Sequence, residues 1–291
     1  MSQKSYDGKA SLYLIPTPIG NLDDITIRAV KTLGEVSVVF AEDTRVTQQL
    51  LKYLNIEKKI IANHEHNEEK NKEKIISYLN EGKNVGLVSD RGTPVISDPG
   101  FVLAKHVIES GYNVIALPGP TALIPSLITS GLSPMPFLFY GFLNSKPGKR
   151  KKELKDLSNE KATMIFYEAP HRITKTLEDV YSVFGNRQIS VSREISKKFE
   201  EIYRGFIIDV IEQTKEVKGE IVFVVEGYRD EEKDIEIDFK KEVNQYVKKG
   251  YNKKEAIKMV ADEFNVNKNK VYNEYHNVSK EWLHEINSGI R

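Results

Sequence analysis

The sequence contains no cysteine in its 291 residues. This absence excludes a disulfide framework, a thiolate zinc site and a cysteine nucleophile, and it fits a reducing compartment. Every apolar run is shorter than the roughly 18 residues that a membrane-spanning helix needs. Residues 1–11 are polar and lack the apolar core of a signal peptide. We therefore expect a cytoplasmic protein.

The chain also lacks a charge excess of either sign. Its 43 basic and 42 acidic residues leave a formal net charge of +1, which does not by itself indicate a nucleic-acid partner. The segment 146–155 is a local exception, because it carries six basic residues and one acidic residue. Two interpretations stay open for it: a solvated linker between domains, or a contact for RNA phosphates.

Short apolar runs alternate with helical patterns over residues 12–117. This alternation favours a largely parallel sheet covered by helices. The expected strands are 12–15, 36–41, 85–88 and 114–117, and the expected helices are 26–33, 48–54, 68–79 and 101–110.

Proline and glycine at 133–136 and 146–148 then interrupt the pattern, and a second α/β block follows. Its expected strands are 163–167, 188–191 and 220–225, and its expected helix is 173–184. The sequence thus predicts an N-terminal α/β domain at 1–145 and a second α/β domain at 146–229.

The last part of the chain, residues 230–291, changes to a purely helical pattern after a charged linker at 229–233. Helices are expected at 239–248, 253–264 and 268–276, with the spacing of a helix–turn–helix module. This module is interpreted either as a compact structural appendage or as a second RNA contact.

The first two motifs follow the first two predicted strands. Residues 16–22, P-T-P-I-G-N-L, form a stiff turn at a strand end, where ligands of open α/β sheets bind. This turn is neither a dinucleotide fingerprint nor a P-loop. In A-E-D-T-R, the carboxylates of Glu42 and Asp43, a threonine hydroxyl and the Arg45 guanidinium can together set up proton transfer or bind a substrate phosphate. The alternative is a helix start capped by Asp43 or Thr44.

Three further motifs also lie at predicted strand ends. S-D-R-G-T-P at 89–94 offers Asp90 as an acceptor and Gly92 for close approach to the backbone, or it is a simple Asx turn. L-P-G-P-T-A-L at 117–123 opens a helix whose first N–H groups can meet a ligand. F-Y-E-A-P-H-R at 166–172 combines an aromatic, an acid, a histidine and an arginine. Together these loops predict a cleft between two α/β domains.

The five motifs, in this order, resemble the ribosomal RNA small-subunit methyltransferase I family of the tetrapyrrole-methylase (class III) fold. The resemblance runs from residue 12 to residue 227, and residues 239–276 are similar to the helix–turn–helix module of that family. It implies two α/β domains with S-adenosylmethionine in the cleft between them, plus a small C-terminal helical module.

The resemblance also implies roles for individual residues. The cofactor-binding positions would be Pro16, Pro18, Asp90, Gly92, Thr93, Thr121, Ala122, Tyr167, Gly219 and Glu220. The reaction would be methyl transfer to the ribose 2′-hydroxyl of a cytidine in the decoding region of 16S ribosomal RNA. Glu42, Asp43 and Glu168 are the candidate bases, and Arg45 and Arg172 are candidates for binding phosphate.

RNA recognition fits the remaining features of the sequence. Tyr140, Phe142 and the basic segment from Lys146 are expected at the rim of the cleft, because aromatic and basic side chains bind unpaired nucleotides. The expected partner is 16S ribosomal RNA or the small ribosomal subunit, and the expected assembly is a homodimer. His64 and His66 do not indicate a metal site.

Two other functions stay open at this point. An enzyme of the same fold can methylate a tetrapyrrole or another small molecule, since a fold does not settle the substrate. A non-catalytic ribosome assembly factor is the second alternative.

Overall fold

The computed structural model describes residues 3–5, 7–229, 238–264 and 266–276. The chain forms two compact units, Met1–Tyr228 and Arg229–Arg291, and each is described by itself. Most of the charged linker expected at 229–233, and the last 15 residues from 277 on, lie outside the described residues. Within the described part, no helix is long and apolar enough to cross a membrane.

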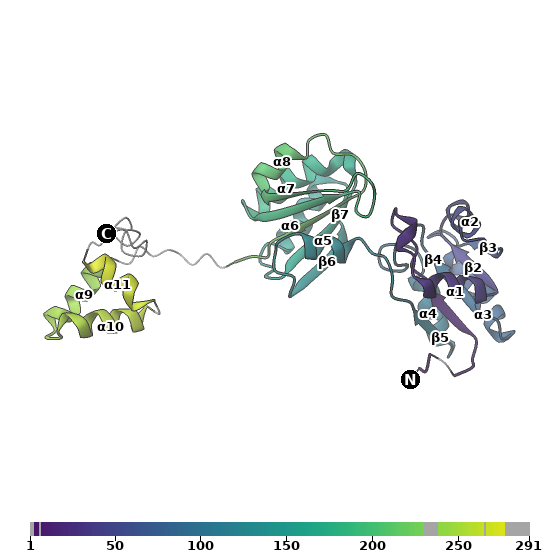
Figure 1. Ribbon diagram of the computed structural model, residues 1–291, viewed down its shortest axis with the longest axis horizontal. Coiled ribbons are helices and arrows are strands. Elements are labelled where there is room, and N and C mark those ends of the chain that lie inside the picture. Colours follow the sequence, from purple (N-terminus) through teal and green to yellow (C-terminus); the bar gives the residue numbers. More distant parts are fainter. Residues whose placement is uncertain (1–2, 6, 230–237, 265, 277–291) are drawn as a thin grey trace, which may run out of the picture. The chain divides into compact units, whose positions relative to one another are not determined.

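The first sheet of the larger unit is entirely parallel, as expected. Its order is β3-β2-β4-β1-β5, with β1 at Ser11–Leu14, β2 at Val38–Ala41, β3 at Lys59–Ala62, β4 at Val85–Val88 and β5 at Asn113–Ala116. All four residues of β2 and of β4 are buried, because helices cover both faces of the sheet (Figure 1).

Four helices provide this cover: α1 at Ile27–Glu35, α2 at Thr44–Tyr53, α3 at Glu68–Asn80 and α4 at Phe101–Glu109. The helices α3 and α4 pack in one core cluster around Phe40 and Leu87, while α1 and α2 pack in another around Val39 and Val88. Because every strand is parallel, all carboxyl ends meet at one edge of the sheet, and the polar loops meet there too.

The second sheet is mixed and has the order β6-β7-β10-β8-β9. Its strands are β6 at Phe137–Phe142, β7 at Thr163–Glu168, β8 at Gln188–Arg193, β9 at Glu201–Phe206 and β10 at Ile221–Val225. β6 runs parallel to β7, and the other neighbours are antiparallel. The sheet therefore already includes residues 137–142, which precede the domain boundary expected at 146.

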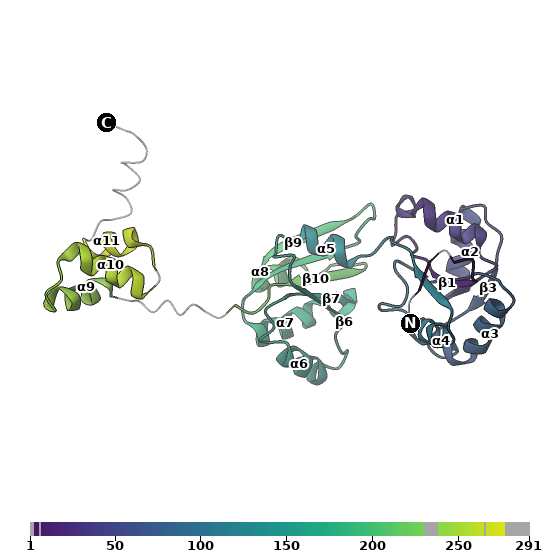
Figure 2. The ribbon, with the colours of Figure 1, turned by 90° about the horizontal axis from the view of Figure 1, so that it is seen from below.

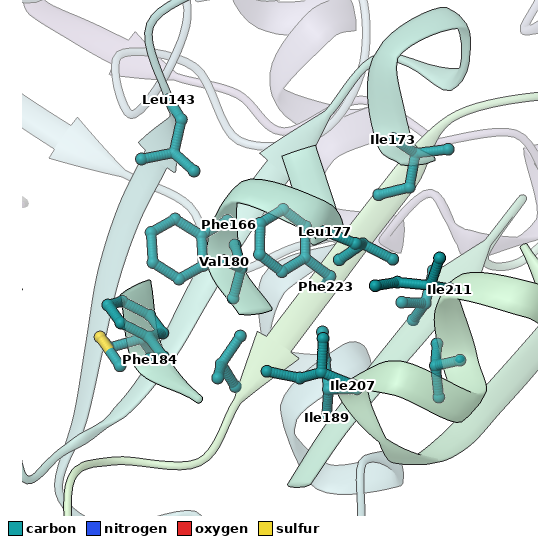
Figure 3. Packing of buried hydrophobic residues seen from close by; sticks show 14 of the residues in the cluster. Leu143, Phe166, Ile173, Leu177, Val180, Phe184, Ile189, Ile207, Ile211 and Phe223 are labelled. Carbon is teal, nitrogen blue, oxygen red and sulfur yellow. The ribbon is translucent and has the colours of Figure 1, made fainter. Parts of the chain in front are cut away.

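Helices also cover both faces of the second sheet (Figure 2). One face packs against α6 at Pro147–Asp156, α7 at Ile173–Phe184 and α8 at Ile207–Gln213. Figure 3 shows this core, in which Phe166 stacks on Phe223 with ring centroids 4.8 Å apart. The other face carries the short helix α5 at Leu123–Thr129 and a smaller cluster that includes Leu127 and Val222.

The basic segment 146–155 is not a linker, so that interpretation is wrong. It forms α6, whose contact with α7 buries Leu154 and leaves only 3% of Arg150 exposed. The Arg150 guanidinium lies 2.6 Å from the Asp179 carboxylate of α7. Five lysines of this segment stay exposed: Lys146, Lys149, Lys151, Lys152 and Lys155.

The smaller unit contains the helices α9 at Phe239–Lys248, α10 at Lys253–Glu263 and α11 at Lys268–Tyr275. Val243, Ile257 and Val271, one from each helix, are buried at their common core. A capping box between Asn252 and Glu255 fixes the start of α10. The two α/β sheets and these helices confirm the expected fold class.

Candidate functional site

Loops at the carboxyl edge of the first sheet are tied to one another by hydrogen bonds. The backbones of Thr17 and Gly92 exchange two hydrogen bonds, at 2.9 and 3.0 Å, which join the loops after β1 and β4. The Thr17 hydroxyl also donates to the carbonyl of Ser89 at 3.2 Å. The Thr93 hydroxyl donates to the carbonyl of Pro120 at 3.0 Å, which joins the loops after β4 and β5. These hydrogen bonds therefore fix the loops after β1, β4 and β5 relative to one another.

Two glycines in these loops are required by the geometry. Gly92 has a φ of +80°, in the left-handed region that side chains disfavour. At Gly119 an added Cβ would lie 2.6 Å from the Cβ of Pro16. The backbone of the turn after β5 therefore packs directly against the proline ring of the turn after β1. Pro16 thus supports the turn after β5.

A cavity of about 380 Å³ opens between these loops and the second sheet. This volume lies in the usual range of about 300–1,000 Å³ for small-molecule sites. The lining residues are Ile19, Arg91, Gly92, Thr93, Ile96, Ser97, Asp98, Thr121, Ala122, Phe142, Tyr167, Glu168, Ala169, Pro170, Ile195, Glu220, Ile221 and Val222. Most of its wall is apolar, and its polar groups come from loops of both sheets.

Two of the carboxylates that line the cavity are neutralised by basic partners. Glu220, at the start of β10, pairs with Arg91 of the loop after β4. Its other oxygen lies 2.9 Å from the Lys197 ammonium. Glu168, at the end of β7, pairs with Arg172 of the short helix η2 (Pro170–Arg172). These pairs hold the rim in place.

Further donors saturate the Glu168 carboxylate, whose side chain is 0% exposed. The Thr176 hydroxyl donates to it at 2.6 Å, and the backbone N–H of Ala169 donates at 2.7 Å. Glu168 thus anchors the chain where it leaves β7 and enters α7.

Tyr167 of β7 is joined to the segment between β5 and α5 at the cavity wall. Its hydroxyl hydrogen bonds with the side chain of Thr121 and with the backbone of Leu123. Burial raises the pKa of this hydroxyl above its ordinary value, so the group is a neutral phenol at neutral pH.

Three carboxylates lie close together behind the loop after β4. Burial raises the pKa of Asp98 to about 6, and the charge of Asp90 adds to the shift. Burial also raises the pKa of Glu42, with further contributions from Asp90 and Asp98. The Asp90 carboxylate itself accepts a hydrogen bond from the backbone N–H of Asp43 at 2.9 Å.

The motif after β2 starts a helix, which confirms the capping interpretation. The Asp43 carboxylate caps α2 by accepting from the Arg45 backbone N–H at 2.8 Å. The Arg45 guanidinium lies 2.6 Å from the same carboxylate, and its hydrogen bonds lower the pKa of Asp43 to about 2. The Arg45 side chain is 86% exposed and points its remaining donors to solvent.

The structure brings about half of the expected site residues to the cavity. Those that line it are Gly92, Thr93, Thr121, Ala122, Tyr167, Glu168 and Glu220. Pro18 and Asp90 line a second cavity of about 240 Å³ beside α2 instead. The others do not line the main cavity: Pro16, Glu42, Asp43, Arg45, Arg172 and Gly219. Gly219 lies against the Glu194 carboxylate, where a side chain would collide.

Several lining residues were not expected from the sequence. Asp98 lies between the loop 89–94 and the helix expected at 101–110, and this position was a signal for it. Ile195, Ile221 and Val222 carry no such signal, because only the packing decides which apolar side chains face a cavity.

The cavity fits the cofactor that the resemblance implies. S-adenosylmethionine carries a flat adenine and a short amino-acid chain, and the apolar wall and the polar groups of Thr93 and Thr121 suit these two parts. The close turn at Gly119 leaves no room for a side chain between the loops that would hold it. Among the described residues, no cluster of acids or histidines could hold a metal ion.

Comparison with known proteins agrees with this geometry. Residues 11–210 match the Tetrapyrrole (Corrin/Porphyrin) Methylases family. The chain is 47% identical to "Ribosomal RNA small subunit methyltransferase I" of Bacillus subtilis, covering 94% of this chain and 98% of that one. It is 42% identical to the protein of that name from Halalkalibacterium halodurans, covering 94% and 99%.

Among solved structures, the methyltransferase CobJ superposes with a TM-score of 0.58 at 18% identity, over 75% of this chain and 95% of that one, a likeness of fold alone. The chain therefore belongs to the tetrapyrrole methylase family, within its ribosomal RNA small subunit methyltransferase I group, and takes S-adenosylmethionine as its cofactor.

Proposed function

We propose that the protein methylates the ribose 2′-hydroxyl of a cytidine in the decoding region of 16S ribosomal RNA. The observation that carries this proposal is the 47% identity, over nearly the whole length, to a protein named for ribosomal RNA small subunit methylation. A cavity of suitable size, built from loops of both sheets, supports it. We also propose that the protein acts in the cytoplasm as a homodimer.

In the proposed reaction, S-adenosylmethionine supplies a methyl group on a sulfonium sulfur, which is already a good leaving group. The protein's task is to hold the hydroxyl oxygen in line with the carbon–sulfur bond. Gly92, Thr93, Thr121 and Ala122 would hold the cofactor's chain, and Tyr167 with Glu220 would border its adenine. Phe142 and the neighbouring apolar wall would exclude water from the reacting atoms.

The candidate bases differ in their readiness to accept a proton. Asp43 is a poor acceptor, because its pKa is about 2 and Arg45 covers it. Glu168 is also poor, because Arg172, Thr176 and a backbone N–H already occupy its oxygens. Burial raises the pKa of Glu42, which favours proton acceptance, but Glu42 does not line the cavity.

A surface for RNA phosphates adjoins the cavity. Phe142 lines the cavity and is half exposed, and α6 begins at Pro147, five residues further along the chain. The exposed lysines of α6 have no ion-pair partner among the described residues, apart from Lys151, which pairs with Asp179. Lysines of this kind bind phosphates without reading sequence. Arg45, held by Asp43, offers a further contact at the first sheet.

The decisive experiment is transfer of labelled methyl from S-adenosylmethionine to purified small subunits that lack the modification, followed by mapping of the product. A 2′-O-methylated cytidine in the decoding region is the expected result. Subunits that already carry the modification are the control and should accept no label. Cofactor binding without transfer to any RNA would contradict the proposal and favour an assembly factor, while transfer to a tetrapyrrole would favour a small-molecule enzyme.

A further inference from the structure

Among the described residues, three carboxylates line the main cavity: Asp98, Glu168 and Glu220. Glu168 and Glu220 each have a basic partner and further donors. Asp98 forms no ion pair within the described part of the chain, and its hydrogen-bond partner is the hydroxyl of Ser89. Of these three carboxylates, Asp98 is therefore the one whose oxygens are left to accept a proton.

The local chain holds Asp98 at the cavity wall. Asp98 precedes Pro99 and Gly100, and Gly100 caps α4 with a φ of +133°. A Cβ at Gly100 would lie 2.7 Å from Leu87 of β4, so this turn is pressed against the sheet. Val95, three residues before Asp98, has a φ of +79°, a strained value for a branched residue. Such strain is typical of segments whose position matters for function.

We propose that Asp98 is the group that accepts the proton of the ribose 2′-hydroxyl during methyl transfer. This inference rests on the proposed function. The oxygen–hydrogen bond breaks and the proton passes to a carboxylate oxygen of Asp98. The oxygen keeps that electron pair and forms its bond to the methyl carbon, while the carbon–sulfur pair leaves with the sulfur. Charge and atoms balance without another reactant.

Asp98 is better placed for this step than Glu42. Asp98 lines the cavity and Glu42 does not, and the Glu42 carboxylate already bonds to the backbone of Asp90. The titratable groups that face Asp98 are Glu42 from the end of β2, Asp90 from the end of β4, and Tyr167 from β7. The two carboxylates among them disfavour a negative charge on Asp98, which makes its carboxylate a stronger base than an exposed one.

The pH dependence follows from the environment of Asp98. Its pKa is raised from 3.8 to about 6, so the carboxylate is largely ionised at pH 7 and largely protonated at pH 5. A base must be ionised to accept a proton, so kcat should rise with pH up to about 6 and then level.

The first test compares Asp98→Asn with the full-length wild type on unmethylated small subunits. Loss of a general base typically lowers a rate by about 10²–10⁴-fold, and we expect kcat to fall in that range. The rising limb of the pH profile should disappear. The Kd for S-adenosylmethionine, measured by calorimetry, should change by less than about threefold. Asp209→Asn, an exposed carboxylate on α8, is the matched control and should leave all three quantities unchanged.

A readout independent of activity is the carbon-13 NMR titration of the aspartate carboxyls in cofactor-free protein. A resonance that titrates near pH 6 should be missing in Asp98→Asn. The inference is overturned if Asp98→Asn keeps kcat within about threefold of the wild type. It is also overturned if the variant weakens cofactor binding in proportion to the lost activity, because Asp98 would then bind the cofactor's cationic groups. If the wild type methylates no RNA, the proposed function fails. The NMR titration tests the inference separately, because an Asp98 carboxyl that titrates near pH 4 overturns it.

Discussion

Substitution of Glu168 by glutamine separates a structural role from a catalytic one. The buried carboxylate accepts hydrogen bonds from Arg172, Thr176 and the Ala169 backbone, so its replacement by a neutral amide removes the charge partner of the partly buried Arg172 guanidinium. Hydrogen bonds to a charged group contribute about 1.5–3 kcal/mol each, against about 0.5–1.5 kcal/mol between neutral groups. Three such bonds weaken in Glu168→Gln, so we expect the free energy of unfolding to fall by about 3 kcal/mol, while kcat of the folded enzyme stays within about threefold.

Urea unfolding followed by far-ultraviolet circular dichroism measures the stability, and methyl transfer at about 25 °C measures kcat. Thr176→Val is the matched variant, because it keeps the side-chain shape and removes one of the donors to Glu168. It should lose about half as much stability as Glu168→Gln, again with little change in kcat. A loss of kcat above about a hundredfold in Glu168→Gln with unchanged unfolding would refute the reasoning and make Glu168 a catalytic group.

Three further outcomes are expected. Gly119→Ala should weaken S-adenosylmethionine binding at least about tenfold in calorimetry, because its Cβ would lie 2.6 Å from Pro16, whereas Gly148→Ala, with no atom within 4 Å, should have no effect. The double variant Lys149→Glu with Lys152→Glu should lower the slope of log K against log salt for RNA binding, by about 0.7 for each phosphate that the protein no longer neutralises. The control is Lys70→Glu with Lys74→Glu on α3. Equal slopes for the α6 variant and the wild type would count against the α6 surface. Because Arg45 lowers the pKa of Asp43 from 3.8 to about 2, the stability from this pair is complete above pH 4 and is lost as the pH falls through 2. Asp43→Asn should remove that part of the pH dependence in thermal unfolding between about pH 5 and pH 2, and an unaltered profile would show that the pair does not contribute.

The first sheet was largely predictable because its strands are buried on both faces. Runs such as Val85–Val88 are apolar throughout and are followed by polar turns, which is typical of parallel strands buried on both faces. The strand β3 was missed because Lys59–Ala62 is short and partly exposed. The strand β9 was also absent from the expected strands. Its residues are a mixture of polar and apolar types and are at most partly buried, so the sequence shows no clear alternation of apolar and polar positions.

The strand β6 was missed for a different reason. Its aromatic residues follow Pro134 and Pro136, which were interpreted as a break between domains. Proline is tolerated there because β6 is an edge strand of the second sheet. The basic segment was misjudged for a similar reason: charge suggested a linker, but Leu154 and the stem of Arg150 give one buried side to a helix.

The sequence indicated which loops meet at the edge of the first sheet, but not which residues of the second sheet line the cavity. Loops such as 89–94 are marked by glycine, proline and polar residues at strand ends, so their meeting at one edge follows from parallel topology. The walls come from the second sheet, where the choice between the two faces of β10 depends on packing that no local pattern records. Asp98 lies between the loop 89–94 and the helix expected at 101–110, but its burial, which raises its pKa, is a property of the folded chain.

The cavity between the two sheets also joins their stabilities. Its wall takes residues from the loops of the first sheet and from β7 and β10 of the second, so a molecule held there binds only when both halves are folded. Such a ligand adds free energy of RT ln(1 + [L]/Kd) to the pair, or about 2.7 kcal/mol at a hundredfold excess over Kd. Bound cofactor should therefore stabilise the two halves together, as a reversible link between the core of the first sheet and the core of the second.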